Sequence, residues 1–239
     1  MEALNQLLNE AAATGSGSGS AIDDRPAAAK TSSEDDSHLR AGVIVLAGCI
    51  DFDNSSKTPE GLEEPHCINL GVPISKSFSS SSSLHMFFVT LDAKRVFVMG
   101  KNDHGQCGTG TVTTVQYPVE LLLDDILSPG DRILSMATGR SHTLLLLSNG
   151  DVWGTGANSE GQLGLGDTKT AAKDALKFVK LPLTRIRDIS CGHDHSLACD
   201  LDGKLFTWGH PLYGCLGFGN DGSFIKESGK GPAIQVIYS

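Results

Sequence analysis

The fold is decided by the stretch Ser141-His-Thr-Leu-Leu-Leu-Leu-Ser-Asn-Gly-Asp-Val-Trp-Gly-Thr-Gly156, which two other parts of the chain repeat. His142–Leu147 predicts a strand that is apolar on both faces. Asn149-Gly150 predicts a two-residue hairpin turn, because Asn and Gly adopt positive φ at low cost. Val152 begins the partner strand. The stretch therefore predicts a β-hairpin that is buried on both sides.

Three copies of this module lie 53 to 57 residues apart, measured between their histidines, with cores near residues 84–110, 141–166 and 194–219. In each copy a glycine ends the second strand, and further glycines follow it after 5, 8 and 10 residues. Self-similarity at a fixed period indicates a repeat architecture. We expect the repeated positions to hold the module together, and they are His85, Gly100, Gly105, Gly108, His142, Gly156, Gly161, Gly164, Gly209, Gly214 and Gly217.

The length of the repeat favours one four-stranded sheet per copy, because no helical periodicity fills the remaining residues. The first copy has Asp92-Ala-Lys-Arg95 at its hairpin turn, without glycine, so this turn should be one residue longer and wider. An all-β fold of stacked four-stranded sheets, as in a β-propeller, is therefore predicted. The remaining strands are expected at Thr114–Leu123, Arg132–Met136, Phe178–Leu183 and Ile186–Ser190, with one more at Ala41–Gly48.

Composition divides the chain into two parts. Residues 1–40 are acidic and include the linker-like run Gly15-Ser-Gly-Ser-Gly-Ser20. We expect this segment to be disordered, apart from a short helix over Met1–Ala13. Residues 41–239 are expected to form the propeller. Glycine makes up 28 of the 239 residues and aromatic residues only 6%, which suits many tight turns better than a thick helical core.

The net charge and the cysteines indicate which partners and which cellular compartment to expect. The net charge is −9, of which residues 1–40 contribute −4 through seven acids and three bases. This balance disfavours direct binding of nucleic acid by the chain alone. The sequence shows no secretory signal and no apolar run of ~20 residues, so we expect no direct membrane insertion. The six cysteines are expected to be reduced thiols in the nucleus and cytoplasm.

One pattern has the residue types of a metal site. Cys191-x-His193-x-His195 would place three possible ligands on one strand face. The repeat already accounts for Cys191 and His195, and the spacing suggests no fourth ligand. We therefore expect a hydrogen-bonded structural role for these residues, and no metal or other cofactor.

Two further patterns have the residue types of catalytic or phosphate sites. Gly105-x-x-Gly108-x-Gly110 reverses the order of the dinucleotide fingerprint, and no helix follows it. We expect it to form turns. His66-Cys67 has no activating partner in the sequence. The sequence therefore predicts a protein that is not an enzyme and has no small-molecule substrate.

A resemblance to a known family is carried by three motifs, which are Cys191-Gly-His-Asp-His195-Ser-Leu, Asp202-Gly-Lys-Leu-Phe-Thr-Trp-Gly209 and Glu160-Gly-Gln-Leu-Gly164. They resemble the regulator of chromosome condensation repeat, and the resemblance covers residues 84–219. Trp208–Gly217 followed by Asn220–Ile225 is similar to one branch of that family. The first copy departs from the pattern, with serines in place of Cys-Gly and Met99-Gly100 in place of Trp-Gly.

The resemblance implies a closed ring of seven blades, and this chain is too short for one. Residues 41–239 number 199, which at ~55 residues per blade make about 3.6 blades. We therefore expect a partial, open propeller with three to four of the seven blades, as in a truncated product. Gly42–Gly48 is expected to need partner strands from a C-terminal segment outside this chain, and Ile237-Tyr-Ser239 to lie in the middle of a module. Such an array would expose unpaired strand edges.

The resemblance also implies partners. In the family's exchange factor, loops near the Gly-x-x-His segment face a small GTPase and loosen its nucleotide. Asp194 and His195 match the acidic form of that segment and His193 lies beside them, so we expect partner binding at these three residues. A GTPase of Rho, Ral or Ran type is expected, with a role in mitosis at the centromere or spindle. Two alternatives stay open: a turn hydrogen bond for Asp194, and a scaffold that binds chromatin or microtubules without exchange.

Overall fold

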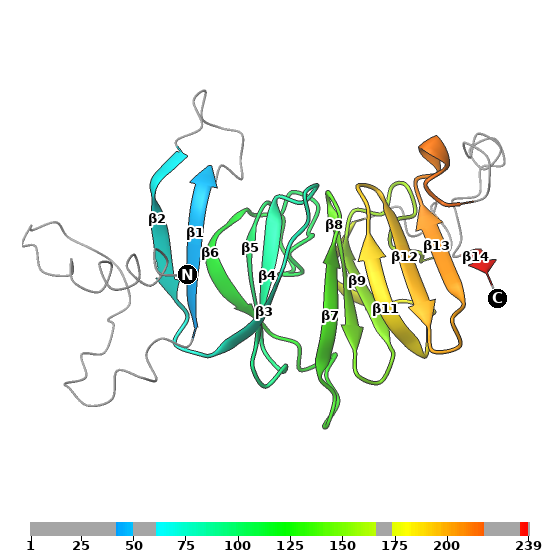
Figure 1. Cartoon of the computed structure of the whole chain (residues 1–239), viewed down its shortest axis with the longest axis horizontal. Coiled ribbons are helices and arrows are strands. Elements are labelled where there is room, and N and C mark those ends of the chain that lie inside the picture. The colour runs from blue at the N-terminus through cyan, green and yellow to red at the C-terminus, as the bar shows by residue number, and fades with distance from the viewer. Residues whose placement is uncertain (1–41, 50–60, 166–173, 218–234, 239) are drawn as a thin grey trace, which may run out of the picture.

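The computed structural model describes residues 42–49, 61–165, 174–217 and 235–238 (Figure 1). The predicted segment of residues 1–40 with its helix, and the stretch Asn220–Ile225, lie outside the described residues. Strands make up the regular structure, apart from one 3-10 turn at Leu212–Gly214. The described residues include no helix with the length and apolar character that spanning a membrane requires.

Three antiparallel four-stranded sheets follow one another along the chain, and each keeps its strands in sequence order. We call the sheets β3–β6, β7–β10 and β11–β14 blade 1, blade 2 and blade 3. The predicted all-β fold of four-stranded blades is confirmed. The strands are β3 (Ile74–Phe78), β4 (His85–Thr90), β5 (Val96–Gly100), β6 (Val115–Leu121), β7 (Ile133–Thr138), β8 (His142–Leu147), β9 (Val152–Gly156), β10 (Ala175–Lys180), β11 (Ile186–Cys191), β12 (His195–Asp200), β13 (Leu205–Gly209) and β14 (Gln235–Tyr238).

A two-stranded sheet precedes blade 1. In it β1 (Val43–Cys49) pairs antiparallel with β2 (Gly61–Asn69). The expectation that β1 finds no partner in this chain was therefore wrong. The sequence did not indicate β2 because polar residues interrupt its apolar ones and because it includes Pro65, which an edge strand tolerates since it needs no N–H there. At the other end β14 pairs with β13 and completes blade 3, where the sequence suggested an interrupted module.

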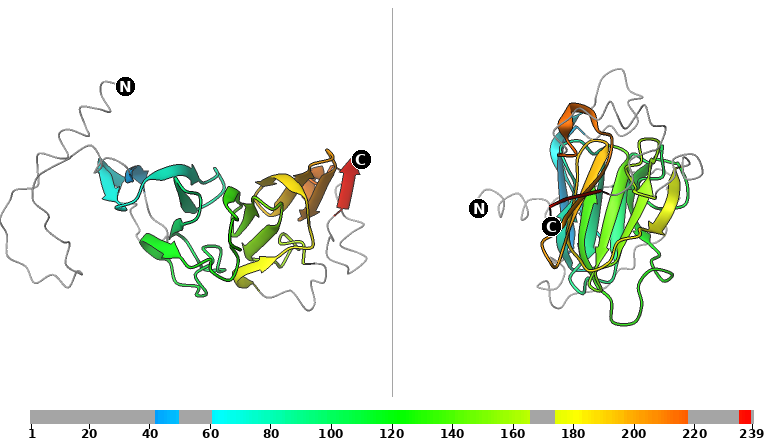
Figure 2. Two further views of the ribbon diagram at one scale, coloured as in Figure 1. Left: turned by 90° about the horizontal axis from the view of Figure 1, so that it is seen from below. Right: turned by 90° about the vertical axis from the view of Figure 1, so that its right-hand side faces the viewer.

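The four sheets stand side by side in chain order, so that β1 and β14 lie at opposite ends of the array (Figure 1). Seen from below, the row bends into an open arc (Figure 2). Apolar side chains fill each junction between sheets. β8 is buried along its whole length because Leu145 and Leu147 pack against blade 1, while Leu144 and Leu146 pack against blade 3. The two apolar faces predicted for this strand are thus explained by a blade on either side.

The hairpin turns differ from prediction in one detail. Leu147 N–H donates to Asp151 O, so the turn of blade 2 has three residues instead of two. Gly150 stands last in this turn with φ 82°, the left-handed position of a three-residue hairpin. In blade 1 the corresponding bond runs from Thr90 N–H to Arg95 O, which makes that turn one residue longer, as predicted.

The fourth strand of blade 2 also lies earlier than expected. β10 covers Ala175–Lys180, whereas the sequence favoured Phe178–Leu183. Pro182 has no N–H to give a sheet, so the strand ends before it. Leu181 and Leu183 are buried all the same, in the core between blades 2 and 3. Their apolar character comes from that core and not from strand pairing.

Candidate functional site

The loops that carry the histidine motifs gather at one end of the blades, which we call the loop face. It consists of the hairpin loops at residues 79–84, 139–141 and 192–194 and the glycine-rich loops that follow β5, β9 and β13. Within each blade, a backbone hydrogen bond joins the two kinds of loop. These bonds run from Lys101 N to Leu84 O (2.8 Å), from Ala157 N to Ser141 O (2.7 Å) and from His210 N to Asp194 O (2.8 Å).

A hydrogen-bond relay connects each repeat histidine to the following blade. His85 Nε2 lies 2.8 Å from Thr143 Oγ1, and that hydroxyl lies 2.8 Å from Gln106 O as its donor. Because the hydroxyl proton goes to the carbonyl, His85 Nε2 must carry a hydrogen and donate it to Thr143. The same relay recurs between blades 2 and 3, with His142 Nε2 2.9 Å from Ser196 Oγ, which donates to Gln162 O at 2.8 Å.

Burial fixes the charge of these two histidines. The Nδ1 atoms of His85 and His142 are buried without a hydrogen-bond partner. Desolvation lowers the pKa of His85 to about 3 and that of His142 to about 4, since a buried imidazolium loses its hydration. Both rings are therefore neutral at pH 7. Two of the positions expected to hold the module are thus uncharged rings that tie adjacent blades together.

This arrangement makes stability depend on pH. The pKa of each ring is lowered below its unfolded value of 6.5, so the unfolded chain binds more protons as pH falls below that value. We expect stability to be full above pH ~6.5 and to fall towards pH ~4, with each ring contributing up to about 1.4 kcal/mol per pH unit. Urea unfolding between pH 7.5 and 4.5 measures the slope. A wild-type stability that does not change over this pH range would contradict the assignment of two neutral, buried rings.

The glycines of the repeat mark close approaches of the chain. A Cβ at Gly156 would lie 2.3 Å from the carbonyl oxygen of Ser141, the residue directly before His142 at the start of β8. A Cβ at Gly108 would lie 2.6 Å from the Phe178 ring in the next blade. The glycine-rich loop after β5 therefore packs onto blade 2, and Gly110 N–H donates to a carbonyl of β10. Its geometry is that of a contact between blades.

The structure brings together two of the three residues predicted to bind a partner. His193 Nδ1 lies 2.5 Å from Asp194 Oδ2, and the two side chains are 55% and 29% exposed. His195 is separate from this pair, because its half-buried ring packs beneath Gly192, where a Cβ would lie 2.1 Å from Cε1. Arg140 N–H donates to His193 O at 2.9 Å and so links the loops of blades 2 and 3.

The expectation that Cys191, His193 and His195 share one strand face was wrong. Cys191 ends β11, His195 begins β12, and His193 lies in the hairpin loop between them. Burial raises the pKa of Cys191 to about 12, so its sulfur is a thiol at neutral pH. Its Sγ lies 3.4 Å from Ala137 O in blade 2. In residues 42–49, 61–165, 174–217 and 235–238 no group of three such side chains has the geometry to hold a metal ion.

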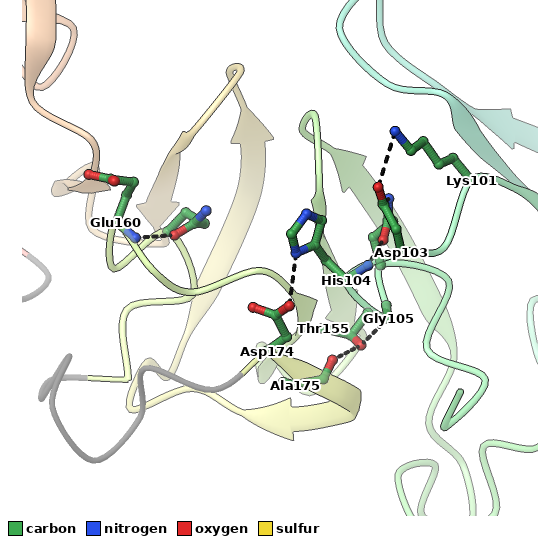
Figure 3. Close-up of polar contacts among 10 residues, drawn as sticks. Lys101, Asp103, His104, Gly105, Thr155, Glu160, Asp174 and Ala175 are labelled. Atoms are coloured by element: carbon green, nitrogen blue, oxygen red, sulfur yellow. Dashed lines mark hydrogen bonds and ion pairs between the residues drawn. The ribbon is translucent and has the colours of Figure 1, made fainter. Parts of the chain in front are cut away.

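Contacts between a histidine and a carboxylate also join the blades on the loop face, and the sequence did not indicate them. His104 Nδ1 lies 2.8 Å from Asp174 Oδ2 of blade 2, as Figure 3 shows. Glu160 Oε2 lies 3.6 Å from His210 Nε2 of blade 3. His104 and Glu160 both stand four residues after the glycine that ends the third strand of their blade. This shared repeat position could have indicated that both side chains reach the next blade. Their partners could not be inferred in the same way, because Asp174 lies outside every repeat core.

The chain is similar to known proteins in both sequence and fold. The pattern described as "Regulator of chromosome condensation (RCC1) repeat" matches residues 95–146 and 149–199, and a second pattern of the same description matches residues 133–162 and 186–215. Protein RCC2 homolog of Xenopus laevis is 33% identical over 71% of this chain and 32% of its own length. Protein RCC2 of Homo sapiens is 34% identical over 66% of this chain and 29% of its own length. The chain thus spans about a third of these relatives.

Other relatives and solved structures agree on the repeat. X-linked retinitis pigmentosa GTPase regulator of Canis lupus familiaris is 35% identical over 60% of this chain and 14% of its own length. Prp20p of Saccharomyces cerevisiae superposes with a TM-score of 0.59 at 22% identity, covering 74% of this chain and 41% of that one. This likeness concerns the fold. With the RCC2 relatives, the repeat matches and the fold in agreement, the chain belongs to the regulator of chromosome condensation repeat family.

Proposed function

We propose that the loop face binds a small GTPase of Rho, Ral or Ran type and that His193 and Asp194 lie in the contact. The observation that carries this proposal is the partly exposed His193–Asp194 pair, which stands where the Gly-x-x-His loop of blade 3 meets that of blade 2. Two relatives support it. One is named as a GTPase regulator, and the structure of Prp20p was described with its binding to Gsp1p and histones.

The chemistry of the pair suits this task. One oxygen of Asp194 engages His193, and the carboxylate is still 29% exposed to a partner. A carboxylate placed against a GTPase would compete with the nucleotide phosphates for basic side chains and for magnesium, which is how such a contact would loosen the nucleotide. The backbone bond from Arg140 to His193 holds the loop in place before binding, which lowers the ordering cost. The protein would act by binding and not by covalent catalysis.

A pair of matched variants tests the proposal. Asp194→Ala removes the carboxylate from the loop face, and Asp202→Ala removes one from the opposite end of the same blade, where it pairs with Arg185 and is 64% exposed. Affinity for a panel of nucleotide-free small GTPases is measured by calorimetry. We expect Asp194→Ala to weaken binding at least ~10-fold, about 1.4 kcal/mol, and Asp202→Ala to change it less than ~2-fold. Absence of binding to every GTPase, or equal affinities of the two variants, would contradict the proposal.

Exchange activity is a separate expectation. Because the chain spans about a third of its RCC2 relatives, we expect it to bind without much acceleration of nucleotide release. Release of a fluorescent guanine nucleotide measures this directly. A rate as high as that given by a longer family member would show that the described blades suffice.

A second candidate is a scaffold role on chromatin or microtubules in the mitotic cell, without exchange. The net charge of −9 favours a basic partner such as a histone surface, and Prp20p was described with histone binding. Co-sedimentation with nucleosomes and with microtubules separates the two candidates. If this role holds, binding should weaken steeply with salt and should not require any GTPase.

A further inference from the structure

A pocket of about 360 Å³ lies where the last strand of blade 1 meets blade 2. Its apolar lining comes from Leu121 and Leu123, at and after the end of β6, and from Trp153 of β9 and Phe178 of β10. Leu122 stands at its rim with 86% of its surface exposed. Because ligand pockets measure roughly 300–1,000 Å³, this one admits a segment of a few residues and not a folded domain.

The aromatic residue near the start of the third strand lies under a cation in blades 1 and 3. The guanidinium carbon of Arg95 lies 5.4 Å from the centroid of the Phe97 ring. Lys204 Nζ lies 5.5 Å from the centroid of the Phe206 ring. Each cation stands two residues before the ring, and the ring quadrupole attracts a positive charge at this distance. The repeat therefore places a cation over this aromatic position twice.

Blade 2 has a different residue at the position of the cation. Asp151 stands where blades 1 and 3 have Arg95 and Lys204, and its carboxylate pairs with Lys180 Nζ at 2.6 Å. Trp153 is half-buried, lines the pocket and has the aromatic ring that cations prefer most. Among the described residues no cation lies over it. A cation supplied by a partner can therefore occupy the place that an arginine and a lysine occupy in the neighbouring blades.

The charged residues of the lining favour a basic ligand near the tryptophan. Asp125 is exposed and makes no ion pair within the described part of the chain. Glu120 already pairs with an arginine of its own blade. Lys177 also lines the pocket, three residues before Lys180, whose backbone pairs with Trp153. At ~3.3 Å per residue along the strand, Lys177 stands about 10 Å from the tryptophan end of the pocket.

We propose that this pocket binds an extended peptide segment that has an arginine and, two residues after it, a large aliphatic side chain. The guanidinium would lie over the Trp153 ring and pair with the Asp125 carboxylate, which its planar fork fits. Alternate side chains of an extended segment point to the same side about 7 Å apart. The aliphatic side chain would therefore enter the apolar part of the pocket, between Leu121 and Phe178. The site is separate from the residues proposed to contact a GTPase, and its test uses no GTPase.

The test uses short peptides with blocked ends and follows the indole N–H signals of the full chain in ¹H–¹⁵N NMR spectra. The peptides are Gly-Arg-Ala-Leu-Gly, a second with glutamate in place of arginine and a third with serine in place of leucine. The chain has two tryptophans. Trp208 is an internal control, because its ring is buried and its Nε1 donates to Gln162 O at 2.8 Å. The Nε1–H of Trp153 has no acceptor, so the two signals differ, and Trp153→Phe assigns them.

We expect the arginine peptide to shift the Trp153 signal with a Kd on the order of 1 mM or tighter, and to leave the Trp208 signal unmoved. The peptides with glutamate or serine should bind at least ~5-fold more weakly. Asp125→Asn should weaken binding of the arginine peptide at least ~3-fold. Asp188→Asn removes an equal charge from an exposed residue of blade 3 and should change the Kd less than ~1.5-fold.

Three results would overturn the proposal. The first is a Trp153 signal that stays in place at ~10 mM arginine peptide. The second is a glutamate or serine peptide that binds as tightly as the arginine peptide, because the pocket would then not recognise the pattern of one basic and one aliphatic side chain. The third is an equal Kd for Asp125→Asn and Asp188→Asn, because the attraction would then come from the net charge of the chain and not from the pocket.

Discussion

Gly156→Ala is expected to lower the free energy of unfolding by at least ~3 kcal/mol, a large fraction of the roughly 5–15 kcal/mol typical of native proteins. Gly156 has φ 103°, a conformation that residues with a Cβ rarely adopt. The new Cβ would also lie 2.3 Å from Ser141 O, 2.8 Å from His142 Cα and 3.1 Å from Gln106 Cα. All three atoms are main chain, so no side chain can rotate away. The backbone around the histidine relay would have to shift.

Gly203→Ala is the matched control. Gly203 has φ 86°, in the hairpin turn of blade 3, and no atom lies within 4 Å of the position of its Cβ. This variant bears the conformational cost alone, about 1–2 kcal/mol. Urea unfolding of the two variants, followed by far-ultraviolet circular dichroism, measures the difference. Equal losses would show that the contact with the histidine strand costs nothing.

The sequence was sufficient for the central strands of each blade. His142–Leu147 and its partner β9 were predicted because a strand buried on both faces leaves a long apolar run and a turn with glycine. β3 was missed because Ile74-Ser-Lys-Ser-Phe78 has its three middle residues exposed and so resembles a loop in composition. β2 and β14 also lie at the outside of their sheets. Edge strands bury fewer side chains, and their sequences therefore show a weaker apolar pattern from which a strand could be predicted.

The candidate site was predictable in part, for a similar reason. His193 and Asp194 are neighbours in the chain, and the repeat motif places them in one loop. The partners across blades were not predictable, because His85 and Thr143 are 58 residues apart and His104 and Asp174 are 70 apart. Such residues meet only because the folded chain packs one sheet against the next. A hydroxyl directly after the histidine, in two of the three copies, was the one local sign of the relay.

Thr143→Val is expected to cost about 2–4 kcal/mol, although it preserves the shape of the side chain. The hydroxyl accepts from His85 Nε2 and donates to Gln106 O, and all three groups lie in the buried junction between blades 1 and 2. Valine would leave the buried N–H of His85 and the carbonyl of Gln106 both unpaired. Thr113→Val at an exposed position is the control and should cost less than ~0.5 kcal/mol. Thermal and urea unfolding give both values.

A double-mutant cycle separates the hydrogen bond from the rest of the cost. His85→Leu alone leaves the hydroxyl of Thr143 bonded to Gln106, so its cost is that of lost ring contacts and a small cavity. When both residues are apolar, the unpaired N–H of His85 no longer exists. The double variant should therefore be less destabilised than the sum of the single ones, by about 1–2 kcal/mol. Strict additivity would mean that His85 and Thr143 do not act as one hydrogen-bonded pair, and the relay would then not be what joins the blades.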